Sequence, residues 1–287
     1  MWRYVARTRR RPRPRAPGPM QTTGRSLSVL THSHLEGLVK YEAAHSVQEQ
    51  HRLRLLEQKS QPNQTIEPPL LVSFEAAPTF TLGRRQDRLA AHEAAKLKQP
   101  LHVRTAGRSF CPVVVNTHRG GLTTYHGPGQ LVLWPVVDLR SSLHPHYGVR
   151  EYARHLQDVT RRLLAEDFAI QTVSLEDEPG VWCQDDESGP RRKIAALGIH
   201  LRRYVAALGV AINVNVSVEG AKDANPWARI VPCGLPDRHV TSIAVEMGDR
   251  APCEWNLGKL ASRWAEIFEQ GLMDASKRTG PYPTNAG

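Results

Sequence analysis

Several features that would place a sequence quickly are missing from this one. No apolar run approaches the roughly 18 residues that a membrane-spanning helix needs. A glycine-rich stretch occurs at 119–130, RGGLTTYHGPGQ, but it matches none of the signatures GxxxxGK[ST], GxGxxG or GxSxG. These absences argue against a membrane span, a P-loop, a dinucleotide-binding loop and a nucleophile elbow.

Acidic residues are missing from the N-terminal segment, where the first is Glu36. The formal net charge of the chain is +10. Eight arginines precede Glu36, so the rest of the chain carries only 10 − 8 = +2. They are Arg3, Arg7, Arg9, Arg10, Arg11, Arg13, Arg15 and Arg25.

An arginine-rich segment with Ser and Thr and without acids is typical of a mitochondrial transit peptide. Its prolines disfavour a regular amphipathic helix, and the alternative is a basic arm that touches nucleic acid or anionic lipid. We expect residues 1–34 to be a disordered or cleaved leader that directs the protein to the mitochondrial matrix. Residues 35–287 are expected to form the catalytic domain.

Paired cysteines are also missing. The four cysteines are far apart and form no CxxC pair, which argues against a zinc site, and a matrix location argues against a disulfide framework. Cys111, Cys183 and Cys253 are interpreted as structural. One of the four cysteines remains a candidate for a catalytic nucleophile.

The apolar patterns predict helices and strands that do not alternate strictly. Helices are expected at 38–56, 87–98, 149–164 and 257–268, and strands at 70–74, 80–85, 110–117, 131–139, 193–201 and 209–216. The run LVLWPVVDL (131–139) contains Pro135, which predicts an edge strand or a bulge. We therefore predict a single α+β domain with a mixed sheet flanked by helices.

Four motifs occur in order along the chain: RGGLTTYHGPGQ (119–130), KIAALG (193–198), GVAINVN (209–215) and IVPCGL (230–235). Together they strongly resemble the lipoyl(octanoyl) transferases, in particular mitochondrial, fungal-like members, over roughly Leu70 to Phe268. The resemblance implies the fold of the biotin and lipoate protein ligase catalytic domain. It also implies transfer of an octanoyl (or lipoyl) group without ATP, a metal or another cofactor.

The resemblance implies roles for individual residues and partners. The acyl-thioester cysteine falls on Cys233 and its paired lysine on Lys193. The donor implied is octanoyl-acyl carrier protein, and the acceptors are lipoyl domains of 2-oxoacid dehydrogenase complexes and the glycine cleavage H protein; no nucleic acid is implied. The substrate-contacting residues implied are Arg119, Gly120, Gly121, Leu122, Thr123, Thr124, Tyr125, His126, Ala196, Leu197, Gly198, Gly209, Val210 and Ala211.

The chemistry of these residue types agrees with that role. A cysteine thiolate can attack the donor thioester, and an amine can then attack the acyl-enzyme. A thiol near neutral pH needs help to ionise, which Lys193 could give as a cation or as a base. The glycine-rich stretch would form one wall of an acyl slot, with Tyr125 and His126 lining or orienting it.

One position departs from the family pattern, because Leu208 stands where many members have histidine. This change puts the shape of the acyl slot in question. Two other functions remain open: an ATP-dependent lipoate or biotin ligase of the same fold, and a protein that binds lipoyl domains or carrier protein without catalysis. A requirement for ATP would identify the ligase, and binding without turnover would identify the non-catalytic protein.

Overall fold

The computed structural model describes residues 29–61, 66–86, 89–175, 178–184, 189–230 and 239–274. Within these ranges the helices and strands follow one another in the order given next. They are β1 (Thr31–Val39), α1 (Tyr41–Gln58), β2 (Leu70–Ala76), β3 (Thr79–Leu82), α2 (Ala91–Leu97), β4 (Leu101–Val103), β5 (Arg108–Phe110), β6 (Val113–Asn116), β7 (Thr124–His126), β8 (Gln130–Asp138), α3 (Val149–Phe168), β9 (Val181–Cys183), β10 (Arg192–Arg202), β11 (Val205–Asn213), β12 (His239–Val240), α4 (Ile243–Met247) and α5 (Leu257–Met273).

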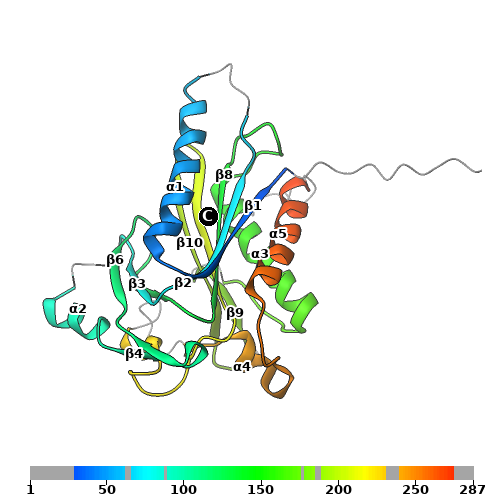
Figure 1. Cartoon of the computed structure of the whole chain (residues 1–287). Coiled ribbons are helices and arrows are strands. Elements are labelled where there is room, and N and C mark those ends of the chain that lie inside the picture. The colour runs from blue at the N-terminus through cyan, green and yellow to red at the C-terminus, as the bar shows by residue number, and fades with distance from the viewer. Residues whose placement is uncertain are drawn as a thin grey trace, which may run out of the picture.

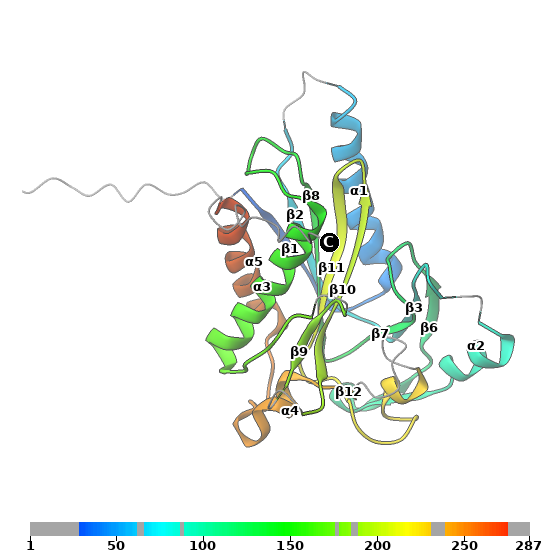
Figure 2. The ribbon, with the colours of Figure 1, turned by 180° about the vertical axis from the view of Figure 1, so that it is seen from behind.

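A seven-stranded mixed sheet forms the centre, in the order β1-β2-β8-β11-β10-β12, with β9 also paired to β10. The pairs β1–β2 and β10–β12 are parallel, and the others are antiparallel. Helix α1 covers one face, and α3 and α5 lie side by side on the other (Figures 1 and 2). This arrangement confirms the predicted α+β fold with a mixed sheet.

Alternation along β8 explains the two cores. Leu131 and Leu133 point to the core shared with α3 and α5, whereas Val132 and Trp134 point to the core shared with α1. Because successive side chains of a strand face opposite sides, a strand with helices on both sides must be apolar throughout. The continuous apolar run at 131–139 therefore marks a central strand.

The prediction that Pro135 places this run at an edge is wrong, since β8 lies between β2 and β11. The neighbouring strand accommodates the missing N–H group. The pairing of β11 with β8 is interrupted opposite Pro135, between Ala206 and Val210, and Leu208 there adopts a φ of 63°. A local bend in β11 thus replaces the bulge expected in β8 itself.

The N-terminal part of the domain differs from the expectation in one respect. Residues 31–39 form strand β1, and the helix expected from residue 38 begins at Tyr41. The strand therefore begins within the expected leader. Its start is tied to α5, because the backbone N–H groups of Val29 and Leu30 both donate to the Glu269 carboxylate, the latter at 2.9 Å.

A smaller sheet, β6-β3-β7, lies to one side of the large sheet (Figure 2), and β4 and β5 form a separate two-stranded ribbon. Phe80 and Tyr125 of the small sheet pack with Trp227 in a third apolar cluster. A turn at Arg203 and Tyr204 joins β10 to β11, and the two strands pair antiparallel. None of the described helices has both the length and the apolar character that a membrane crossing requires.

Candidate functional site

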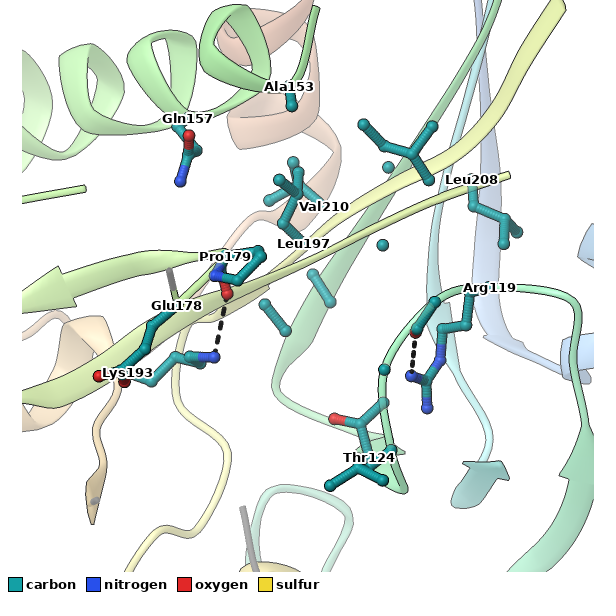
Figure 3. Close-up of a pocket in the computed structure, with 18 of the residues that line it drawn as sticks. Arg119, Thr124, Ala153, Gln157, Glu178, Pro179, Lys193, Leu197, Leu208 and Val210 are labelled. Carbon is teal, nitrogen blue, oxygen red and sulfur yellow. Dashed lines mark hydrogen bonds between the residues drawn. The ribbon is translucent and has the colours of Figure 1, made fainter. Parts of the chain in front are cut away.

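A cleft of about 1550 Å³ opens between α3, the edge of the large sheet at β10, and the loop before β7 (Figure 3). Lys193 lines it, as do all the substrate-contacting residues named above except Tyr125. Three stretches that are separated in sequence thus meet around one space.

Two of these stretches lie on adjacent strands in direct register. Ala196 pairs with Ala211, Leu197 with Val210, and Gly198 with Gly209. Strand β9 pairs with β10 only as far as Ala195, so within the described ranges the rest of β10 has a partner on one side only. The cleft can therefore be lined by side chains from both faces of β10, such as Leu197 and Ala196.

Lys193 lies at the start of β10 and is 8% exposed. Its Nζ donates a hydrogen bond to the carbonyl of Pro179 at 3.1 Å and lies 4.3 Å from the centre of the Trp182 ring (Figure 3). A carbonyl oxygen and the face of an indole both suit an ammonium group. A Cβ at Gly180 would lie 3.1 Å from Lys193 Cε, so this glycine leaves room for the lysine side chain.

Arg119 holds the glycine-rich loop in shape. Its Nη2 donates to the Thr81 carbonyl at 2.6 Å and to the Thr81 hydroxyl at 2.9 Å, and its Nη1 donates to the Gly120 carbonyl at 3.0 Å (Figure 3). A Cβ at Gly198 would lie 3.2 Å from Arg119 Cδ. Glycine at position 198 therefore lets the arginine stem lie close to β10, and the arginine braces the loop.

The end of the glycine-rich stretch shows the alternation of strand β7. Thr124 and His126 line the cleft, whereas Tyr125 points away from it and packs against Phe80 and Trp227, with ring centroids 5.2 and 5.9 Å apart. The tyrosine thus lies in the core behind the cleft wall, where a wall position had been expected. Its ring supports the loop from behind.

His126 is buried, and its ring contacts Gln130 and Tyr41. Its Nδ1 is 2.8 Å from the side-chain oxygen of Gln130, and its ring stacks on Tyr41 at 5.7 Å. Burial lowers the pKa of His126 to about 4; the bond to Gln130 opposes this, and the charge of Arg119 adds to the lowering. The imidazole is therefore uncharged near neutral pH.

Leu208 also lines the cleft and is 7% exposed. It contacts the core beneath α1, which includes Tyr41 and Trp134. Its φ of 63° lies in the left-handed region, which a leucine adopts only at a cost. The apolar side chain thus forms part of the cleft wall at the position where the resemblance suggested histidine.

Cys233 lies outside the described residues, in the segment 231–238. Described residues near both ends of this segment line the cleft, Trp227 before it and Val240 after it. Val240 is the register partner of Lys193, and the backbone N–H of Thr241 donates to the Lys193 carbonyl at 3.0 Å. The three cysteines of the described residues do not line the cleft; Cys183 is buried, and Cys111 and Cys253 are exposed.

Four arginines that no sequence motif singles out also line the cleft. Arg84 and Arg85 follow β3, and Arg150 and Arg154 are one turn apart on α3; all four are exposed. The spacing of four residues, which puts Arg150 and Arg154 on one face of a helix, is the feature of the sequence that could have indicated this pair. In the described part of the chain, no group of three or more His, Cys, Asp or Glu residues could hold a metal ion.

Comparisons with known proteins agree with this geometry. Residues 50–268 match the family model "Lipoyl protein ligase A/B catalytic domain". A Koribacter versatilis protein named octanoyltransferase is 33% identical over 75% of this chain and 77% of its own length. A zebrafish (Danio rerio) protein named octanoyl-[acyl-carrier-protein]:protein N-octanoyltransferase, mitochondrial, is 32% identical over 81% and 89%.

A solved structure shares the fold. It belongs to a bipartite lipoate protein ligase from Thermoplasma acidophilum, with a TM-score of 0.52 and 15% identity. The similarity covers 85% of this chain and 82% of that one. At this level of identity the likeness concerns architecture alone.

Proposed function

This chain belongs to the octanoyltransferases, a family of acyltransferases with the lipoyl protein ligase A/B catalytic domain, and from this premise we propose that it transfers an octanoyl (or lipoyl) group from acyl carrier protein to a lysine of a lipoyl-bearing domain. The observation that carries the proposal is the cleft itself. It gathers Lys193 and all but one of the substrate-contacting residues that the family resemblance implies.

The proposed reaction has two steps. The Cys233 thiolate attacks the donor thioester; a C–S bond forms to the enzyme, the bond to the carrier breaks, and the carrier thiolate leaves and takes up a proton. The acceptor amine then attacks the acyl-enzyme. A C–N bond forms, the C–S bond breaks, the amine loses a proton to a base, and the Cys233 thiolate is restored.

The position of Cys233 in the sequence supports this role. It lies three residues after Ile230 and six before His239. Trp227, before this segment, and Val240, after it, both line the cleft, and Val240 is the register partner of Lys193. These described neighbours support the proposal that Cys233 acts together with Lys193 at the cleft.

An intact-mass experiment tests the proposal. The protein is mixed with octanoyl-loaded carrier protein, and we expect a hydroxylamine-sensitive octanoyl adduct that a lipoyl domain then removes. Cys233→Ser should form no such adduct. A protein that binds the carrier without any adduct, or that modifies the lipoyl domain only when ATP and free octanoate are supplied, would instead be a binding protein or a ligase.

The arginines of the cleft support a carrier protein as the donor. Three arginines that do not line the cleft, Arg161 and Arg162 on α3 and Arg263 on α5, form ion pairs with Asp158, Glu166 and Asp167. No ion pair within the described ranges involves the cleft residues Arg84, Arg85 or Arg150. Positive charge is thus concentrated where a partner would bind, and an acidic carrier protein complements it.

We expect the double variant Arg85→Gln/Arg150→Gln to raise KM for octanoyl carrier protein about five- to tenfold, because each exposed charge contributes up to about 1 kcal/mol. The double variant Arg162→Gln/Arg263→Gln removes the same charge away from the cleft and should leave KM unchanged. Steady-state rates at low and high salt measure both. Equal increases in KM in the two variants would show that only net charge matters.

We further propose a mitochondrial location. The arginine-rich, acid-free N-terminal segment has the composition of a transit peptide, and the zebrafish relative is named mitochondrial. The leader would end before Val29, because the N–H groups of Val29 and Leu30 are bound by Glu269. As acceptors we propose lipoyl domains of 2-oxoacid dehydrogenase complexes and the glycine cleavage H protein.

A further inference from the structure

A row of buried polar side chains joins three strands at the wall of the cleft, which two of its members, His126 and Asn213, also line. The Asn213 side-chain nitrogen donates to the backbone carbonyl of Thr241 at 2.9 Å. The Gln130 nitrogen donates to the Asn213 side-chain oxygen at 2.9 Å, and the Gln130 oxygen lies 2.8 Å from His126 Nδ1. His126, Gln130 and Asn213 are 6%, 1% and 3% exposed. They come from β7, β8 and β11.

The backbone carbonyl at the end of this row fixes every orientation in it. A carbonyl can only accept, so the Asn213 nitrogen must face Thr241 and its oxygen must face Gln130. The Gln130 nitrogen must then face Asn213, which leaves its oxygen toward the histidine. His126 Nδ1 must therefore carry the hydrogen, and in the neutral ring the lone pair is on Nε2.

That lone pair is available to the cleft. Nε2 makes no hydrogen bond within the described part of the chain, and it is not one of the buried polar atoms sealed from solvent without a partner. His126 itself lines the cleft, and Tyr41 stacks on its ring and holds the ring plane. His126 Nε2 is therefore a hydrogen-bond acceptor that faces the cleft in a fixed direction.

The row of buried polar side chains is also joined, through Thr241, to the backbone of Lys193. Thr241 accepts from Asn213 through its carbonyl and donates through its N–H to the Lys193 carbonyl at 3.0 Å. The Thr241 hydroxyl donates to Glu246 at 2.7 Å, and Glu246 pairs with Arg192 at 2.9 Å. The imidazole of His126 and the backbone of Lys193 are therefore joined by one connected set of hydrogen bonds.

We propose that His126 Nε2 accepts a hydrogen bond from an N–H group of a substrate, and that Gln130 and Asn213 are positioning residues that keep the lone pair on Nε2. This inference rests on the proposed acyl transfer, which offers two N–H groups. They are the amine of the acceptor lysine and an amide of the pantetheine arm on the donor. The histidine orients this group, and the proton stays on the nitrogen of the substrate.

Nitrogen-15 NMR of the full chain labelled at histidine tests the positioning directly. In the wild type we expect His126 protonated at Nδ1. Gln130→Met should release this preference, and Gln130→Glu should restore it, because a carboxylate oxygen also accepts from Nδ1–H. Gln48→Met is the matched control, since Gln48 is an equally buried glutamine on α1 that does not line the cleft.

The two half-reactions, followed by mass, show which substrate group is bound. We expect Gln130→Met to slow one of them about tenfold, the effect of one hydrogen bond. A slower transfer to the lipoyl domain identifies the amine; a slower formation of the acyl-enzyme identifies the donor amide. A wild-type ring protonated at Nε2, or unchanged rates in a folded Gln130→Met whose tautomer has shifted, would overturn the proposal. A wild type without any acyl transfer would instead refute the proposed function and leave the NMR result standing.

Discussion

Replacing Lys193 with methionine is expected to lower kcat/KM for octanoyl transfer by about 10²- to 10⁴-fold, the usual contribution of a positioned acid, base or cation. Methionine has similar length and no charge, so it can keep the contact with the Trp182 ring. The loss should come from missing charge or proton transfer rather than from an altered fold. Steady-state kinetics with octanoyl carrier protein and a lipoyl domain measure it.

Lys59→Met is the control for this substitution. Lys59 forms an ion pair with Asp138 at 2.6 Å and does not line the cleft. Its replacement should lower stability slightly and leave kcat/KM within about twofold at temperatures where the protein is folded. A Lys193→Met protein with wild-type kcat/KM would exclude Lys193 from the reaction.

Replacing Gly209 with alanine is expected to destabilise the protein by about 3 kcal/mol or more. A Cβ at this position would lie 2.4 Å from the Leu133 carbonyl oxygen and 2.7 Å from Pro135 Cδ. Both atoms belong to the central strand β8, whose backbone cannot move without disturbing both cores. A chain of this size should melt about 6 to 12 °C lower.

Gly120→Ala is the matched control, because Gly120 also lines the cleft and a Cβ there would have no atom within 4 Å. Its φ is not in the left-handed region. Thermal and urea unfolding should leave this variant within about 0.5 kcal/mol of the wild type. Equal stability of Gly209→Ala would mean that β8 and β11 can separate at Pro135 at little cost.

Local patterns predicted much of the fold. The spacing of three and four predicted helices α3 and α5, and apolar segments predicted strands at the positions of β10 and β11. The error at Pro135 has a physical origin. A proline is expected at an edge because it lacks a donor, but the compensating bend is in β11 at Leu208, more than seventy residues away in sequence.

The site could be predicted only in part, for a similar reason. The motifs predicted Lys193 and the contact stretches as parts of one site. They could not show that Ala196 pairs with Ala211 between β10 and β11. Gln130 ends the glycine-rich stretch, but the motif does not indicate its role, because its partners His126 and Asn213 meet only when β7, β8 and β11 have assembled. Which residues meet in the site is decided by pairing between strands that are far apart in the sequence, and no single motif contains it.

The attachment of β1 to α5 has a consequence for proteolytic processing. Leu30 is buried in the main core, and the N–H groups of Val29 and Leu30 are bound by Glu269. A cut after these residues would remove two donors from a carboxylate and an apolar side chain from the core. A processing protease that leaves the domain intact must therefore cut before Val29, and a cut directly there would set the new terminal ammonium beside Glu269.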